Sequence, residues 1–181
     1  MNQTKNFKIS ALIRRAVTFL IYYFSAGFSA EIVRLMLKSL FAIIFGAGSD
    51  MQGIALDIVG VAAIAACLAV FSSREGYNDT DTLRYSIGKM ALAVFASALM
   101  FASAAVPLKF MSETIPADDT HGIFQLIYRF FISQYYLSSW VHFGFVLAVS
   151  FLILVLAYRS GRNRWIAAKK RRIEELRRTG D

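Results

Sequence analysis

The sequence predicts an all-α, polytopic membrane protein: a four-transmembrane-helix bundle with an outer amphipathic helix and a basic cytoplasmic C-terminal helix. Two observations lead to this prediction. Hydrophobic residues make up 57% of the 181 residues and charged residues only 18%, whereas soluble domains average about 25% charged residues. The apolar residues also gather in runs with few charges, and about 18 such residues are enough to cross a bilayer as a helix.

Four apolar runs are expected to be the membrane spans of one domain, which covers residues 1–159. They lie at about 10–30, 54–72, 87–108 and 140–158. The first run is the weakest, because Arg14 and Arg15 interrupt its start and would have to extend toward the membrane surface. The fourth contains no Asp, Glu, Lys or Arg. Residues 160–181 follow as a basic cytoplasmic tail.

Basic residues are unevenly distributed around these spans. If both termini are cytoplasmic, sixteen of the 20 lysines and arginines lie on the inner side and four on the outer side. Such a bias sets the orientation of membrane proteins, so we expect both termini in the cytoplasm. A bacterial cytoplasmic membrane fits a small multispan protein of this kind. The net charge of +8 then reflects topology, and no nucleic-acid partner is expected.

The segment 31–45 is expected to be an interfacial helix on the outer face. Its charged residues Glu31, Arg34 and Lys38 recur on one side of a helix, and most other positions are apolar, as in helices that lie at a membrane surface. A spanning or re-entrant course for 31–45 stays open. A fifth span would place three charges in hydrocarbon and the basic tail outside, so four spans are preferred.

A glycine-rich stretch, FGAGSD, follows this segment. We expect Gly46 and Gly48 to adopt positive φ in a tight turn, and Asp50 to cap the next helix. A phosphate-binding loop would need a lysine followed directly by a serine or threonine after its last glycine, which is absent here, and nothing indicates the carbonyl ladder of an ion filter. The turn is therefore the favoured interpretation.

Asp57 is the strongest single candidate for a functional residue. It lies about one turn inside the second span, and ionisable residues within membrane spans are costly and commonly functional. Arg34 or Lys38 on the preceding helix could pair with it. Together with Glu31, these residues are candidates either for transport or for structural pairing.

The outer segment at about 119–138 is expected to form a second amphipathic helix. Aromatic residues are dense in this region and in the start of the fourth span, as in the belts at headgroup depth. Arg129 and Trp140 are therefore expected to contact lipid or a partner. At the start of the segment, Asp118, Asp119 and His121 are weak candidates for a metal or catalytic site. Their spacing matches no recognised metal pattern, and no cofactor is expected.

The basic tail is expected to contact anionic lipid headgroups, because each basic residue near such a surface contributes about 1 kcal/mol of attraction. Docking of a cytoplasmic subunit is the alternative. The candidate contact residues are Trp165, Lys169, Lys170, Arg171 and Arg172.

The sequence contains no catalytic constellation, and its second and third spans are rich in the small residues that allow helices to pack closely. It therefore favours a non-enzymatic subunit or accessory component of a membrane assembly, a homo- or hetero-oligomer that binds lipid and partner helices. A small transporter or channel for an ion, a proton or a small solute, using Asp57 and the outer charged helix, is the alternative hypothesis. A membrane enzyme with an outer-face Asp/His site is the third.

Overall fold

The computed structural model describes residues 3–78, 87–114, 119–136 and 139–178, which form six helices and no strand. The helices are α1 (Gln3–Phe45), α2 (Asp50–Asn78), α3 (Ile87–Thr114), α4 (Asp119–Phe131), α5 (Ser133–Tyr136) and α6 (Trp140–Arg178). The predicted all-α fold is confirmed. Three helices, α2, α3 and α6, are long and apolar enough to cross a membrane, which indicates a membrane-embedded protein.

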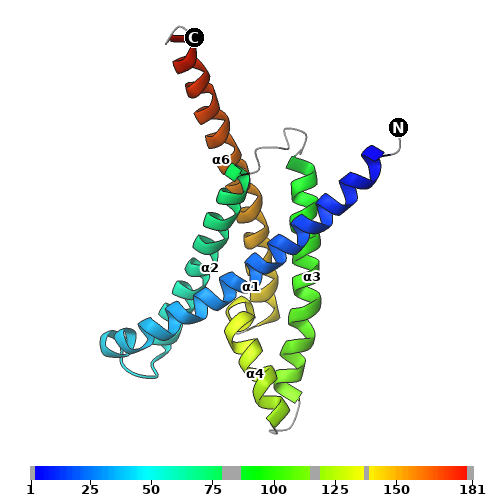
Figure 1. Cartoon of the computed structure of the whole chain (residues 1–181). Coiled ribbons are helices and arrows are strands. Elements are labelled where there is room, and N and C mark those ends of the chain that lie inside the picture. The colour runs from blue at the N-terminus through cyan, green and yellow to red at the C-terminus, as the bar shows by residue number, and fades with distance from the viewer. Residues whose placement is uncertain (1–2, 79–86, 115–118, 137–138, 179–181) are drawn as a thin grey trace.

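The four long helices form the body of the molecule, and α1 crosses α2 and α3 obliquely (Figure 1). Helix α2 packs against both α1 and α6. Helix α4 begins near the end of α3 and runs back toward α1 (Figure 1), and the short helix α5 contacts α1 and α6. The end of α2, the start of α3 and both described ends of the chain lie toward the opposite end (Figure 1).

Helix α2 buries one stripe of residues at a spacing of four. The stripe consists of Gln52, Leu56, Gly60, Ile64, Leu68, Ser72 and Gly76. A stripe of this spacing forms one of the ridges by which helices pack into the grooves of their neighbours. Small members of the stripe allow those neighbours to approach closely.

Two glycines set the crossing of α2 and α6. A Cβ atom on Gly76 would collide with the backbone carbonyl of Tyr158, and one on Gly161 would collide with that of Ser73. Nearby, the Ser72 hydroxyl donates a hydrogen bond of 2.6 Å to the Leu154 carbonyl. Because lipid tails are as apolar as leucine, contacts of this kind rather than burial from water hold such helices together.

Aromatic rings fill the centre of the bundle. The rings of Tyr23 and Phe101 stack with their centroids 5.2 Å apart, and Tyr135 lies 4.7 Å from Phe101. The Tyr135 hydroxyl donates a hydrogen bond of 2.8 Å to the Tyr23 carbonyl. Large apolar side chains such as Ile58 and Leu156 are exposed on the outer surface of the helices, as expected of surfaces that face lipid.

Two predicted boundaries are not breaks between helices. Residues 10–30 and 31–45 form one continuous helix, α1, which contains no proline that would interrupt its hydrogen bonds. Residues 140–158 and the basic tail are likewise continuous in α6. The segment at about 119–138 was expected to be one helix, but it divides into α4 and α5 at Ile132. Its last two residues, 137–138, lie outside the described part of the chain.

The glycine turn is confirmed, since Gly46 and Gly48 have φ of 88° and 75°. The prediction that Asp50 caps α2 is wrong. Instead, the Ser49 hydroxyl accepts a hydrogen bond of 3.2 Å from the backbone N–H of Gln52, which is the bond that a capping residue makes to the third residue of a helix. Asp50 occupies the first turn, where the positive end of the helix dipole stabilises its negative charge.

Candidate functional site

The structure brings five of the predicted site residues together where α1, α2 and α4 meet. They form a group that we call the outer charged cluster, after the side of the membrane expected from the sequence, and Gln134 of α5 joins it: Glu31, Arg34, Lys38, Asp57, Arg129 and Gln134. The three residues on α1 share one side of that helix because they are three and four positions apart. The grouping follows from that spacing and from the packing of α2 and α4 against this side of α1.

Glu31 is the buried centre of this cluster. The Glu31 residue is only 3% exposed. One carboxylate oxygen accepts a bond of 3.2 Å from Nε of Arg129, and the other accepts a bond of 2.7 Å from Nε2 of Gln134. A buried carboxylate needs such partners, because desolvation penalises the unpaired charge. Glu31 therefore ties α1 to both α4 and α5.

Asp57 forms the ion pair that the sequence predicted with α1. Its Oδ1 lies 3.3 Å from an Nη atom of Arg34, and the two side chains are 38% and 35% exposed. Ion pairs with this exposure contribute only about 0–1 kcal/mol to stability. The pair supplies Asp57 with a counter-charge, which favours the structural interpretation over a carboxylate that awaits a transported cation.

A cleft of about 340 Å³ opens beside the cluster. Its charged lining consists of Glu31, Arg34, Lys38 and Arg129, and Leu35 and Leu56 supply apolar surface. Three cations therefore surround one carboxylate that is already paired. Ser133 also lines the cleft, and its hydroxyl donates a hydrogen bond of 2.7 Å to the backbone carbonyl of Arg129.

Gln134 depends on a glycine of α2. Its Oε1 is buried and has no hydrogen-bond partner within the described part of the chain. It lies directly against Gly60, where a Cβ atom would come within 3.5 Å of the Gln134 side-chain carbonyl carbon and still closer to the oxygen. Gly60 thus makes the space that allows the Gln134 amide to reach Glu31.

A cation–aromatic cluster that sequence reasoning missed lies near this end of α3. Nζ of Lys109 is 2.6 Å from a carboxylate oxygen of Glu113. It also lies 5.8, 5.0 and 5.8 Å from the ring centroids of Tyr128, Tyr136 and Trp140. Cations at such distances are attracted to the ring faces. The predicted contact residue Trp140 therefore packs within the chain here, and Lys109 links α3 to α4, α5 and α6.

The tyrosines of α5 are expected to ionise at a higher pH than exposed tyrosines do. Burial raises the pKa of Tyr136 to about 12 and that of Tyr135 well above its usual value of 10. Both stay neutral in the folded protein while an unfolded chain ionises near pH 10. The stability that this gives is complete below pH 10 and falls as the pH rises toward 12.

Tyrosinate absorbance measured during an alkaline titration of the folded protein in detergent checks this expectation. Tyr136→Phe should remove a group that ionises near pH 12 and leave the earlier transition unchanged. If all 8 tyrosines ionised together near pH 10, the packing of α5 would be contradicted.

The remaining site candidates are not part of this cluster. Asp118 and the side chains of Asp119 and His121 lie outside the described part of the structure. Among the residues that are described, no group of three His, Cys, Asp or Glu side chains could hold a metal ion. The metal and enzyme hypotheses thus stay untested.

The contact residues predicted in the tail all lie on α6, beyond its crossing with α2. Nζ of Lys169 lies 5.0 Å from the ring centroid of Trp165. All described residues from Ala167 to Arg178 are exposed, and this part of α6 extends away from the other helices (Figure 1). We call residues 162–178 the α6 extension.

Comparisons with protein-family models, with curated proteins and with solved structures give no match to this chain. The chain is a helical, membrane-embedded protein that carries the outer charged cluster and an exposed basic helix.

Proposed function

We propose that the protein is a non-enzymatic accessory subunit of a membrane assembly, and that the α6 extension docks an acidic partner protein in the cytoplasm. The single observation that carries this proposal is the exposure of the α6 extension. Every described residue from Ala167 onward is exposed, so this part of α6 buries little surface in the bundle and leaves its basic residues accessible to a partner.

The chemistry of the α6 extension supports a protein partner. It contains eight basic and two acidic residues, which suits an acidic surface. Ile173 and Leu176 lie eight and eleven positions after Trp165, so the three residues share one side of a helix with 3.6 residues per turn. Amphipathic helices commonly insert such a stripe into an apolar groove of the partner.

The length of the α6 extension favours a protein over the membrane surface as its main contact. Seventeen residues beyond Gly161 extend about 26 Å at 1.5 Å per residue. Attraction between exposed charges falls off over about 8 Å at physiological ionic strength. A helix that continues straight out of the membrane thus holds its last basic residues, Arg177 and Arg178, beyond the reach of anionic headgroups. Lipid contact remains for the residues close to the membrane.

We further propose that α1 is a fourth crossing and that both termini are cytoplasmic. The arrangement in Figure 1, with both described chain ends toward one end of the bundle, agrees with an even number of crossings. The basic residues concentrate before the first apolar run, between the second and the third, and after the fourth, and such residues mark the cytoplasmic side. The segment 31–45 then begins at the outer surface, and a bacterial cytoplasmic membrane remains our proposed location.

Extraction of the tagged protein in mild detergent, followed by mass measurement of the intact assembly, tests the docking proposal. We expect a fixed-ratio complex for the full chain and its loss when the chain is truncated after Ile166. A second variant keeps the full length of the helix and changes only Ile173 and Leu176 to glutamine. This variant should weaken the complex at least tenfold. A complex that survives truncation would contradict docking through α6.

The small-transporter hypothesis is the second candidate, and the cleft of about 340 Å³ beside the outer charged cluster favours it. The pairing of Asp57 with Arg34 counts against it. Solute or ion flux into proteoliposomes that Asp57→Asn abolishes, in a protein that purifies without partners, would favour transport over the accessory-subunit proposal.

A further inference from the structure

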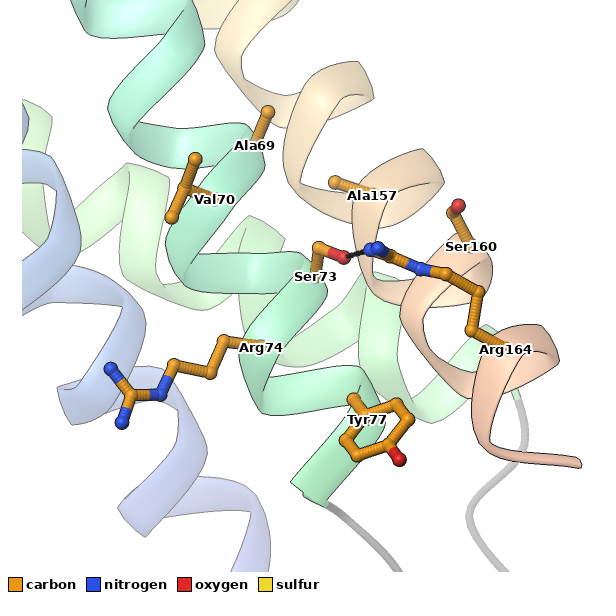
Figure 2. Close-up of a pocket in the computed structure, with 8 residues that line it drawn as sticks. All are labelled: Ala69, Val70, Ser73, Arg74, Tyr77, Ala157, Ser160 and Arg164. Atoms are coloured by element: carbon orange, nitrogen blue, oxygen red, sulfur yellow. Dashed lines mark hydrogen bonds between the residues drawn. The ribbon is translucent and has the colours of Figure 1, made fainter. Parts of the chain in front are cut away.

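A second hollow, of about 560 Å³, lies between α2 and α6. Its lining side chains, drawn in Figure 2, divide into an apolar part and a polar part. The apolar part is Ala69, Val70 and Ala157, and the polar part is Ser73, Arg74, Tyr77, Ser160 and Arg164. The polar residues follow the apolar ones along both helices toward the end of α2. A cavity with an apolar and a polar part suits an amphiphilic ligand.

The walls of this α2–α6 groove are fixed by backbone contacts. A Cβ atom on Gly161 would lie 3.0 Å from the backbone nitrogen of Tyr77 and 2.8 Å from the carbonyl carbon of Ser73. Both of these residues line the groove. Small side chains above this contact, such as Ala69 and Ala157, leave the space open (Figure 2). The groove is therefore largely preformed, which lowers the entropic cost of binding.

Arg164 is the cation of the α2–α6 groove. Its guanidinium reaches from α6 to α2, where it donates a hydrogen bond to the Ser73 hydroxyl (Figure 2). Ser73 is neutral, none of the lining residues is acidic, and no ion pair of Arg164 with a described carboxylate is found. An arginine offers five N–H donors, so several remain for a ligand. Arg74 extends away from Arg164 on the other side of α2 (Figure 2).

We propose that the α2–α6 groove binds an anionic phospholipid, whose phosphate lies against Arg164 with the Ser73 and Ser160 hydroxyls beside it. The first methylenes of its acyl chains lie along Ala69, Val70 and Ala157. A guanidinium recognises phosphate oxygens with paired, charge-assisted hydrogen bonds, and basic pockets between transmembrane helices are suited to acidic headgroups.

The apolar part of the groove distinguishes a lipid from a soluble phosphate ester. A soluble ester would contact Arg164 equally well but would leave Val70, which is 63% exposed, and the two alanines uncovered. The inference deepens the lipid-binding part of the proposed function and rests on the membrane location. It is independent of docking through the α6 extension, because truncation after Ile166 leaves every groove residue in place.

The experiment titrates the full-length protein in neutral detergent with phosphatidylglycerol or phosphatidylcholine and counts bound lipids by native mass spectrometry. We expect a preference of about tenfold for the anionic lipid, which corresponds to about 1.4 kcal/mol. Arg164→Gln should abolish this preference. Ala157→Phe, which fills the apolar part and keeps Arg164, should abolish binding of the first lipid molecule. Arg159→Gln removes the same charge from an exposed position on α6 that does not line the groove, and it should keep the preference.

Three results would overturn the proposal. One is equal binding of the two lipids to the unaltered protein. Another is an equal loss of preference in Arg159→Gln and Arg164→Gln, which would indicate attraction by general charge rather than a site. The third is displacement of the lipid by an equal concentration of glycerol phosphate, which would assign the groove to soluble phosphate esters. Thermal unfolding of each variant identifies any that fail to fold, and Ala157→Phe tests the site without disturbing the bond between Arg164 and Ser73.

Discussion

Alanine at Gly76 or Gly161 is expected to separate α2 from α6 and to lower the free energy of unfolding in detergent by about 2 kcal/mol. A methyl group on Gly76 would lie 2.9 Å from the carbonyl carbon of Tyr158 and 3.1 Å from its Cα. These are backbone atoms, so the helices must move apart rather than repack a side chain. Overpacking of this kind costs about 1–3 kcal/mol, and the better helix propensity of alanine returns up to about 1 kcal/mol.

The same two helices offer matched controls for this prediction. Gly53 on α2 and Gly144 on α6 have no atom within 4 Å of a Cβ built on them, so alanine there should leave stability unchanged or raise it. Unfolding followed by circular dichroism, with a denaturing detergent as titrant, compares the four variants. Equal stability of all four would mean that the glycine contact does not set the α2–α6 crossing.

Arg129→Met is expected to destabilise the protein by about 2 kcal/mol, because it leaves the Glu31 carboxylate buried without its counter-charge. Removal of one partner from a fully buried ion pair costs about 3–5 kcal/mol. The expected loss is smaller here, because the Arg129 side chain is 61% exposed and water screens part of the interaction. Gln134 alone then remains bonded to Glu31.

A second substitution separates the effect of charge from that of packing. Glu31→Gln in the Arg129→Met background removes the unpaired charge and should recover at least half of the lost stability. Arg34→Met is the matched control, since it breaks the exposed pair with Asp57 and should change stability by no more than about 1 kcal/mol. A loss at Arg34 as large as that at Arg129 would contradict the central position of Glu31.

The sequence was sufficient for the helical class and for the grouping of the charged residues on α1. Charges at positions 31, 34 and 38 lie on one side of a helix whatever its neighbours are, and Asp57 is placed so that a pair with Arg34 follows once α1 and α2 are joined by a short turn. The turn itself was equally predictable, because positive φ is a local property of glycine.

The partners of Glu31 were not predictable in the same way. Arg129 and Gln134 lie about 100 residues from Glu31 in the sequence, and only the packing of α4 and α5 against α1 brings them together. The Lys109 cluster has the same origin, since its three rings come from α4, α5 and α6. Gly76 and Gly161 carried no signal either, because a glycine beside polar residues at the end of an apolar run is also typical of a helix terminus.

The continuity of α6 has a mechanical consequence. One rod joins the lipid-facing body of the bundle to the solvent-exposed basic residues, and its backbone closely approaches that of α2 at Gly161. Rotation of this rod by 10° about that contact would displace its far end by about 4–5 Å, given a lever of roughly 26 Å at 1.5 Å per residue. Tilting is one way in which helices accommodate a change of bilayer thickness, so a binding partner held at the tip, as we propose, would experience the state of the membrane as a change of position.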